Sequence, residues 1–100
     1  MKFEWDEAKS KLNIKKHGFD LADGAELFTG SAPFLVNLDT SQDREEDLWK
    51  GIGVLQGVVV VAVVFTERDD DVIRIISLRK ASSREKKAYE EEIKNRLGAG

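Results

Sequence analysis

The chain has 100 residues, of which 41% are hydrophobic and 35% charged, a balance that predicts one globular domain and excludes a disordered chain. It contains no cysteine, which excludes disulfides and thiolate metal sites, and its longest apolar run, Val58–Phe65, is far too short to cross a bilayer. The formal net charge of −3 argues against indiscriminate nucleic-acid binding but is compatible with a local basic site.

These limits set our expectations for organisation and location. We expect a single domain over residues 1–97 and a short flexible tail over residues 98–100. No secretory signal is visible at the amino terminus, so we predict a cytoplasmic protein without a membrane partner.

The amino-terminal part predicts a short strand followed by a helix. Lys2–Trp5 alternates polar and apolar residues, which makes it a candidate edge strand. Asp6 is a candidate N-cap for a helix that reaches about His17, where Gly18 supplies the left-handed C-terminal residue. The polar residues of this helix fall on one stripe at helical spacing: Lys9, Asn13, Lys16 and His17.

A second helix is predicted after Asp20, which is another N-cap candidate. Leu21, Ala25 and Phe28 follow at i, i+4 and i+7, a spacing that gives this helix a buried face.

The rest of the chain predicts a sheet and a last helix. Val58–Thr66 is apolar at nearly every position, so we expect a central strand with both faces covered. Ser82 and Glu85 form a capping box for a final helix that reaches about Leu97. The other expected elements are strands at Phe34–Leu38, Leu48–Leu55 and Val72–Arg79, an acidic loop over 39–47, a turn at Gln56-Gly57, a polar turn over 68–71, and an apolar line of Tyr89, Ile93 and Leu97 on the last helix.

Hairpin connections between these strands favour an α+β domain with N-terminal helices, an antiparallel sheet of three or four strands plus the possible short N-terminal edge strand, and a C-terminal helix. Charge is unevenly distributed over it. Residues 39–47 are mostly acidic, whereas residues 72–87 hold six cations against Glu85 alone. The second segment therefore predicts a local basic site.

Several motifs in this order resemble the BrnT toxin family. In the first half these are Trp5-Asp6-Glu7-Ala8-Lys9, Asn13 and Lys16-His17-Gly18. In the second half they are Gly53, Val64-Phe65-Thr66-Glu67-Arg68, Ile73-Arg74-Ile75-Ile76-Ser77, Arg79-Lys80-Ala81, and Arg84-Glu85 with Tyr89. The resemblance extends over nearly all of residues 2–90.

The resemblance implies a RelE-like fold and a role as the toxin of a type II toxin–antitoxin pair. Such a toxin is an endoribonuclease that cleaves RNA, arrests translation, and is neutralised by a DNA-binding antitoxin of the BrnA-like, ribbon-helix-helix kind. A homodimer and a toxin–antitoxin heterotetramer are the assemblies we consider.

This chain departs from the family pattern at one loop. The family often has a basic residue where Asp47 stands, and a histidine in the preceding loop, where this chain has Ser41-Gln42. The departure supports a different class of function, in which the chain is a non-catalytic protein-binding module that keeps the antitoxin surface.

RNA can be cut without a metal because its own 2′-hydroxyl can attack the adjacent phosphorus, provided that charge on the phosphoryl oxygens is stabilised. Arginine suits this task, since its planar fork binds two oxygens and stays charged. Arg68, Arg74 and Arg79 are therefore our catalytic candidates.

Strict strand alternation would place Arg74 and Arg79 on opposite faces of the sheet. Either a bulge realigns them or only one of them lines the site. The structural alternative is that Arg74 pairs with a carboxylate such as Glu67 and that Arg79 is a solvated strand end.

His17 and Glu67 are the candidate proton carriers. His17 is the only histidine, and its ordinary pKa near 6.5 suits proton transfer at neutral pH, although a histidine at a helix end is more often structural. Glu67 could act as a base if burial raised its pKa, or it could be a salt-bridge partner. For Tyr89 we favour packing over stacking on a base.

Lys9, Lys16, Lys80 and Arg84 are candidate RNA-binding residues, with a solvated charged surface as the alternative. We expect no cofactor and no metal, because one histidine without cysteine cannot make the usual zinc site. A metal-dependent nuclease built on Asp69-Asp70-Asp71 is the remaining alternative.

Overall fold

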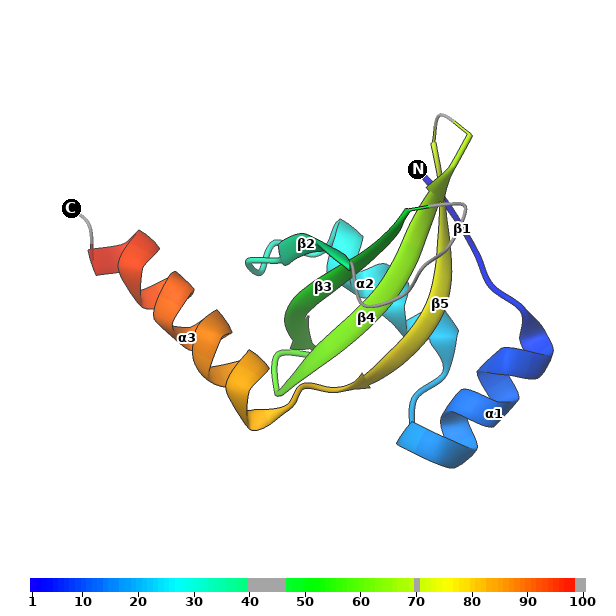
Figure 1. Ribbon diagram of the computed structural model, residues 1–100, viewed down its shortest axis with the longest axis horizontal. Helices are drawn as coiled ribbons and strands as arrows, with labels where there is room; N and C mark the ends of the chain where they lie inside the picture. Colours follow the sequence, from blue (N-terminus) through cyan, green and yellow to red (C-terminus); the bar gives the residue numbers. More distant parts are fainter. Residues whose placement is uncertain (40–46, 70, 99–100) are drawn as a thin grey trace.

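A computed structural model of the chain describes residues 1–39, 47–69 and 71–98. It has one five-stranded sheet with helices on its two faces (Figure 1). Its elements are β1 (Lys2–Glu4), α1 (Glu7–His17), the 3-10 helix η1 (Leu21–Gly24), α2 (Ala25–Thr29), β2 (Leu35–Asp39), β3 (Leu48–Leu55), β4 (Val59–Arg68), β5 (Val72–Lys80) and α3 (Ser83–Gly98).

The strand order is β1-β5-β4-β3-β2, with β4 in the centre as predicted. The pairs from β2 to β5 are antiparallel, but β1 lies parallel to β5, with Lys2 opposite Val72 and Glu4 opposite Arg74. The α+β class is confirmed, as are the four antiparallel strands and the short N-terminal edge strand, whose parallel direction was not predicted. Pairing between segments so far apart in sequence has no local signal.

A register shift in β5 determines which side chains share a face. Val64 of β4 pairs with Ser77, but the next residue, Phe65, pairs with Ile75, so Ile76 is an extra residue in β5. This bulge switches the alternation, and Ile75 and Leu78 therefore both belong to the core cluster although they are three positions apart.

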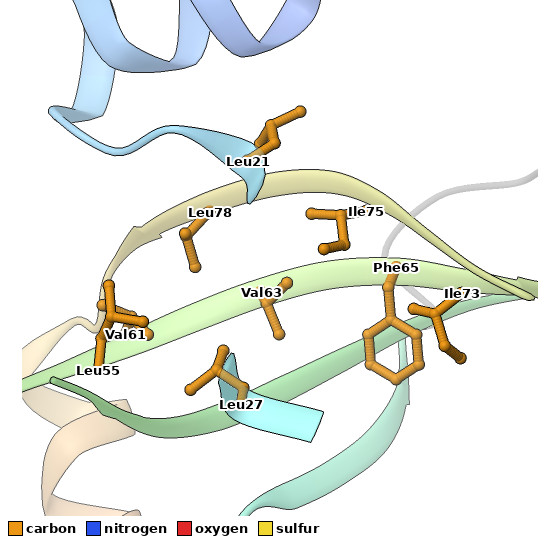
Figure 2. Packing of buried hydrophobic residues seen from close by; sticks show 9 residues of the cluster. All are labelled: Leu21, Leu27, Leu55, Val61, Val63, Phe65, Ile73, Ile75 and Leu78. Atoms are coloured by element: carbon orange, nitrogen blue, oxygen red, sulfur yellow. The ribbon is translucent and has the colours of Figure 1, made fainter. Parts of the chain in front are cut away.

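The main core lies between one face of the sheet and the helices η1 and α2 that cover this face (Figure 2). The strands contribute Leu55, Val61, Val63, Phe65, Ile73, Ile75 and Leu78 to it, and η1 and α2 contribute Leu21 and Leu27. The single helix predicted after Asp20 is thus a 3-10 turn followed by one short helix. This change of helical phase buries Leu27 in place of Ala25 and leaves Phe28 half-buried.

Two glycines inside β3 make room for this core. A Cβ at Gly51 would overlap the ring of Phe34, and one at Gly53 would lie 2.9 Å from Leu27 Cδ2. At the end of the same strand, Gln56 and Gly57 both have positive φ, as a tight hairpin turn requires. Glycine at 51 and 53 therefore allows close packing of β3 against α2 and the segment that follows it.

Among the residues that the structure describes, α3 covers the opposite face of the sheet at one end. Tyr89 packs with Ile52 and Ala62, and its hydroxyl donates to the Pro33 carbonyl oxygen at 2.7 Å, which confirms packing as its role. Figure 1 shows α3 running past the β2 side of the sheet toward the carboxyl terminus.

The far end of α3 differs from expectation. Leu97 is 81% exposed, so it does not extend the apolar line of Tyr89 and Ile93. Gly98 belongs to the helix, and residues 99–100 of the expected tail lie outside the described residues. Most of the predicted acidic loop, including Ser41-Gln42, and Asp70 of the acidic turn also lie outside them.

Asn13 docks α1 onto β5 beyond the reach of β1. Leu78 pairs with Val63 of β4 on one side, and on its other side, beyond the pairing of β1 with Val72–Arg74, its backbone faces α1. The Asn13 amide donates to the Leu78 carbonyl at 2.7 Å and to the Phe19 carbonyl at 2.8 Å, and it accepts from the Leu78 amide at 3.3 Å. Asn13 is therefore a buried structural residue and not part of an exposed polar stripe.

We expect Asn13→Ala to lower the free energy of unfolding by about 2–4 kcal/mol, since each buried backbone group left without a partner costs about 1–3 kcal/mol. Urea denaturation followed by circular dichroism measures the change. Lys15→Ala, at an exposed position of the same helix, is the matched control and should stay within about 0.5 kcal/mol of the parent. Equal effects of the two substitutions would contradict the docking role of Asn13.

Candidate active site

Beside α3, the second sheet face carries a group of partly exposed cations. Because of the bulge at Ile76, Arg74 and Arg79 both point to this face, opposite to Ile75 and Leu78. Of the two sequence-based alternatives, realignment by a bulge is the correct one. Lys50 of β3 joins them, since it lies opposite Val64, which in turn pairs with Ser77.

Glu85 binds two of these cations at once. Its carboxylate accepts two hydrogen bonds from the Arg79 guanidinium, at 2.7 and 3.0 Å, and forms an ion pair of 3.0 Å with Lys50 Nζ. It also accepts from the Ser82 amide at 2.8 Å, while Ser82 Oγ accepts from the Glu85 amide at 3.1 Å, so the predicted capping box is confirmed. The first turn of α3 is thereby tied to the sheet.

These partners control the protonation of Glu85. Hydrogen bonds from Arg79 hold the pKa of the Glu85 carboxyl well below its ordinary range, and the Ser82 amide and Lys50 add to the effect. Partial burial acts in the opposite direction and is outweighed. Glu85 is therefore ionised at neutral pH.

Glu4 of β1 plays a similar part at the other end of the cation group. Its carboxylate lies 3.6 Å from Arg74 and 3.6 Å from Arg68. The expected alternative partner, Glu67, is exposed and pairs in register with Ile73, a core residue, so it lies on the other face from Arg74. The structure thus separates Glu67 from the arginines.

The cations remain open to solvent although they are paired. The side chains of Arg79 and Lys50 are 36% and 37% exposed, and that of Arg74 is 28% exposed. A ligand with anionic oxygens can therefore reach them by exchanging with a carboxylate.

The basic residues of α1 flank the same region. Lys9, Lys16 and His17 are exposed and line a shallow groove together with Ile76 and Ser77 of β5. Near the bulge of β5, the lysines of α1 therefore lie on one side of the strand, and Arg74 and Arg79 lie on the adjoining sheet face.

Two predicted RNA-binding residues lie elsewhere. Lys80 is opposite the core residue Val61, so its alternation places it on the first sheet face, away from Arg79. Arg84 is exposed on α3 beside Ser83 and Lys87, on the surface of the helix. The structure does not bring either of them into the cation group.

The acidic turn after β4 is engaged in part by the amino terminus. The Asp71 carboxylate forms an ion pair of 2.9 Å with the amino group of Met1, and Asp70 lies outside the described residues. Within residues 1–39, 47–69 and 71–98, no three acidic or histidine side chains come together as a metal-binding group.

Comparison with known proteins identifies the family. Residues 5–85 match the family described as the ribonuclease toxin, BrnT, of type II toxin–antitoxin systems. The chain belongs to the BrnT family. A crystal structure of the Brucella abortus ribonuclease toxin BrnT is 34% identical in sequence, with a TM-score of 0.63, and the match covers 83% of this chain and 99% of that one. A comparison with curated proteins gives no match.

Membership of the BrnT family confirms the resemblance drawn from the motifs. Sequence reasoning missed Lys50 and gave Glu85 a capping role alone. Lys50 is the one charged residue of the strand Leu48–Leu55, and an isolated cation in an otherwise apolar strand was the available signal. Within the described part of this BrnT-family chain, no helix is long and apolar enough to cross a membrane.

The Glu85 ion pairs should make stability depend on pH. Because the pKa of Glu85 in the folded chain is below its ordinary value of 4.5, its stabilising effect is complete above about pH 5 and is lost as the pH falls further. We expect Glu85→Gln to cost about 1.5–3 kcal/mol at pH 7 and progressively less below pH 4.5. Urea denaturation of both proteins between pH 7 and pH 2.5 measures the difference. A cost independent of pH would show that the charge of Glu85 does not stabilise the fold.

Proposed function

We propose that this BrnT-family chain is a metal-independent endoribonuclease that arrests translation in the cytoplasm. In this reaction the 2′-hydroxyl of RNA attacks the adjacent phosphorus, and a cyclic phosphate remains on the upstream fragment. The proposed site is the open sheet face with Arg74, Arg79 and Lys50. Arg68 lies at its edge and shares Glu4 with Arg74.

The observation that carries this proposal is the placement of Arg74 and Arg79 on one face by the bulge at Ile76. Two guanidinium groups on a rigid sheet can bind phosphoryl oxygens before the reaction and stabilise the charge that develops during it. Lys50 of β3 adds a third cation to the same face. It lies near Arg79, because both side chains form ion pairs with Glu85.

The groove of α1 supports RNA binding next to this site. Lys9 and Lys16 would neutralise backbone phosphates that follow or precede the cleaved bond. His17 lies in the same groove and is our candidate proton donor to the leaving 5′-oxygen, since histidine is the side chain that most often transfers protons in catalysis.

We further propose that the antitoxin is a DNA-binding, ribbon-helix-helix protein of the BrnA kind with an acidic docking segment. The exposed cations of the sheet face would attract such a segment, and its carboxylates would compete with RNA for Arg74 and Arg79. A toxin–antitoxin heterotetramer fits this arrangement, with a toxin homodimer as the alternative assembly.

A second candidate function is the non-catalytic, antitoxin-binding module. It is favoured by two observations: Asp47 is exposed where the family often has a basic residue, and each arginine of the site already has a carboxylate partner. The carbonyl oxygen of Asp47 accepts a hydrogen bond from the Thr66 hydroxyl at 2.9 Å, which gives this position a structural role as well.

We expect the purified protein to cleave single-stranded RNA in excess chelator, and Arg79→Ala to reduce the cleavage rate about 100- to 1,000-fold. Gel analysis of labelled RNA measures the rate and identifies the cyclic phosphate. Arg96→Ala is the matched control, because Arg96 also pairs with a glutamate but lies near the end of α3. Binding to the antitoxin without any RNA cleavage at protein excess would favour the non-catalytic module, and cleavage that requires a divalent cation would favour the metal-dependent alternative.

For the α1 groove we expect a double substitution, Lys9→Ala with Lys16→Ala, to weaken RNA binding without a large change in kcat. The slope of log affinity against log salt concentration should become shallower by about 0.7 for each phosphate that the protein no longer neutralises. Fluorescence anisotropy of labelled RNA between 50 and 200 mM salt, roughly the range over which such effects are resolved, measures the slope. The control is the double substitution Lys11→Ala with Lys15→Ala, which changes the net charge by the same amount. Equal slopes for the two double variants would contradict a role for the groove.

A further inference from the structure

Glu85 is a carboxylate with both oxygens engaged, at the centre of the proposed site. Its side chain is only 13% exposed. Oε1 accepts from Arg79 and from the Ser82 amide, and Oε2 accepts from Arg79 and pairs with Lys50. The charged groups of other elements that face it are thus Arg79 of β5 and Lys50 of β3.

A bound phosphate would change these interactions unequally. The fork of Arg79 and the ammonium of Lys50 are the groups that phosphoryl oxygens would bind. When they turn to phosphate, Oε2 is released from both Arg79 and Lys50, whereas Oε1 keeps the Ser82 amide, because that bond belongs to the helix cap. The carboxylate would stay anchored by one oxygen and have the other oxygen available beside the phosphate.

We propose that Glu85 is the general base of RNA cleavage, with Oε2 accepting the proton of the attacking 2′-hydroxyl. This inference rests on the proposed nuclease function. The 2′-oxygen forms a bond to phosphorus as the bond from phosphorus to the 5′-oxygen breaks. The 2′-hydroxyl proton goes to Glu85, and the leaving 5′-oxygen takes a proton from the candidate donor His17 or from water.

Other carboxylates of the described chain fit this role less well. Glu67 lies on the opposite sheet face, and Glu4 is 40% exposed at the β1 edge, where it serves Arg68 and Arg74 at 3.6 Å. Glu85 alone among the described carboxylates is shared by Arg79 and Lys50.

The ion pairs also explain how the base would be switched on. While Arg79 and Lys50 are bound to it, the pKa of Glu85 is too low for efficient proton transfer at neutral pH. Phosphate that binds those cations removes their effect and adds negative charge nearby, and both changes raise the pKa of the carboxyl. Proton transfer would thus become efficient only with RNA in place.

The deciding experiment uses Glu85→Gln in the full chain. Glutamine can still accept from the Ser82 amide and preserve the capping box, but it cannot take the proton. We expect kcat to fall about 100-fold or more, while the Kd for an RNA analogue with a single 2′-deoxy nucleotide at the cleavage position changes less than about threefold or becomes tighter. Glu92→Gln is the control, because Glu92 pairs with Arg96 on the same helix and lies outside the site.

The pH profile provides a readout that a purely structural role would not change. The parent protein should show an acidic limb in kcat, and Glu85→Gln should lack that limb while retaining its residual rate. If this variant does not fold, carbon-13 NMR of glutamate carboxyls in the parent protein replaces it. The 2′-deoxy analogue should then shift the Glu85 resonance and raise its titration midpoint.

Several results would overturn the inference. Cleavage by Glu85→Gln at the parent rate or faster would show that Glu85 only competes with phosphate. A parallel loss of analogue binding and cleavage would show that it only positions Arg79, and an unmoved carboxyl resonance would exclude it as well. Failure of the parent protein to cleave RNA would remove the nuclease function itself, whereas an active Glu85→Gln beside an active parent removes only the general base.

Discussion

The extra residue Ile76 in β5 is the constraint on which the sheet and the site both depend. Ile73 and Ile75 precede it and Leu78 follows it, and all three reach the same core only because the bulge changes the alternation. Without that change, Arg79 would share the core face with Ile73 and Ile75, and Leu78 would leave the core. Burying an arginine without water is far more costly than losing one ladder position, so core packing and the placement of the cations favour the same register.

The bulged strand needs support on its open side, and α1 provides it. β1 ends its pairing at Arg74, and the Asn13 side chain takes over at Leu78, where it bonds both the amide and the carbonyl as a neighbouring strand would. This interaction fixes the backbone directly before Arg79. The strand next to Arg79 is therefore held in place by a buried side-chain amide far away in sequence.

Local signals were sufficient for the ends of most elements. The Asp6 cap, the left-handed Gly18, the Gln56-Gly57 turn and the box of Ser82 and Glu85 each depend on a few neighbouring residues, and each was predicted correctly. Non-local features were not predictable in this way. The parallel pairing of β1 depends on β5, which is far away in the sequence. The change from the 3-10 helix η1 to the α-helix α2 occurs where Gly24 packs against Ile75 and Val63 of the sheet.

The residues of the candidate site also include some that could be predicted from the sequence and others that depend on the tertiary structure. Arg74 and Arg79 could be proposed from composition and from the family resemblance, and a bulge was recognised as one way to bring them together. Its position, however, was decided by core packing. Lys50 and Glu85 are 35 positions apart in the sequence, and only the pairing of β3 with β4 and of β4 with β5 brings them within 3.0 Å. Glu67 is separated from Arg74 and Arg79 because the regular alternation of β4 places it on the same face as the core residue Phe65.

The two halves of the family motif have different physical roles in this chain. In the first half, Asp6 caps a helix, Asn13 completes a strand edge and Gly18 ends the helix, so these residues identify a fold. In the second half, Arg74 and Arg79 carry charge on a solvent-exposed sheet face that the hydrophobic core does not require, and this is why the proposed function starts from that half of the motif.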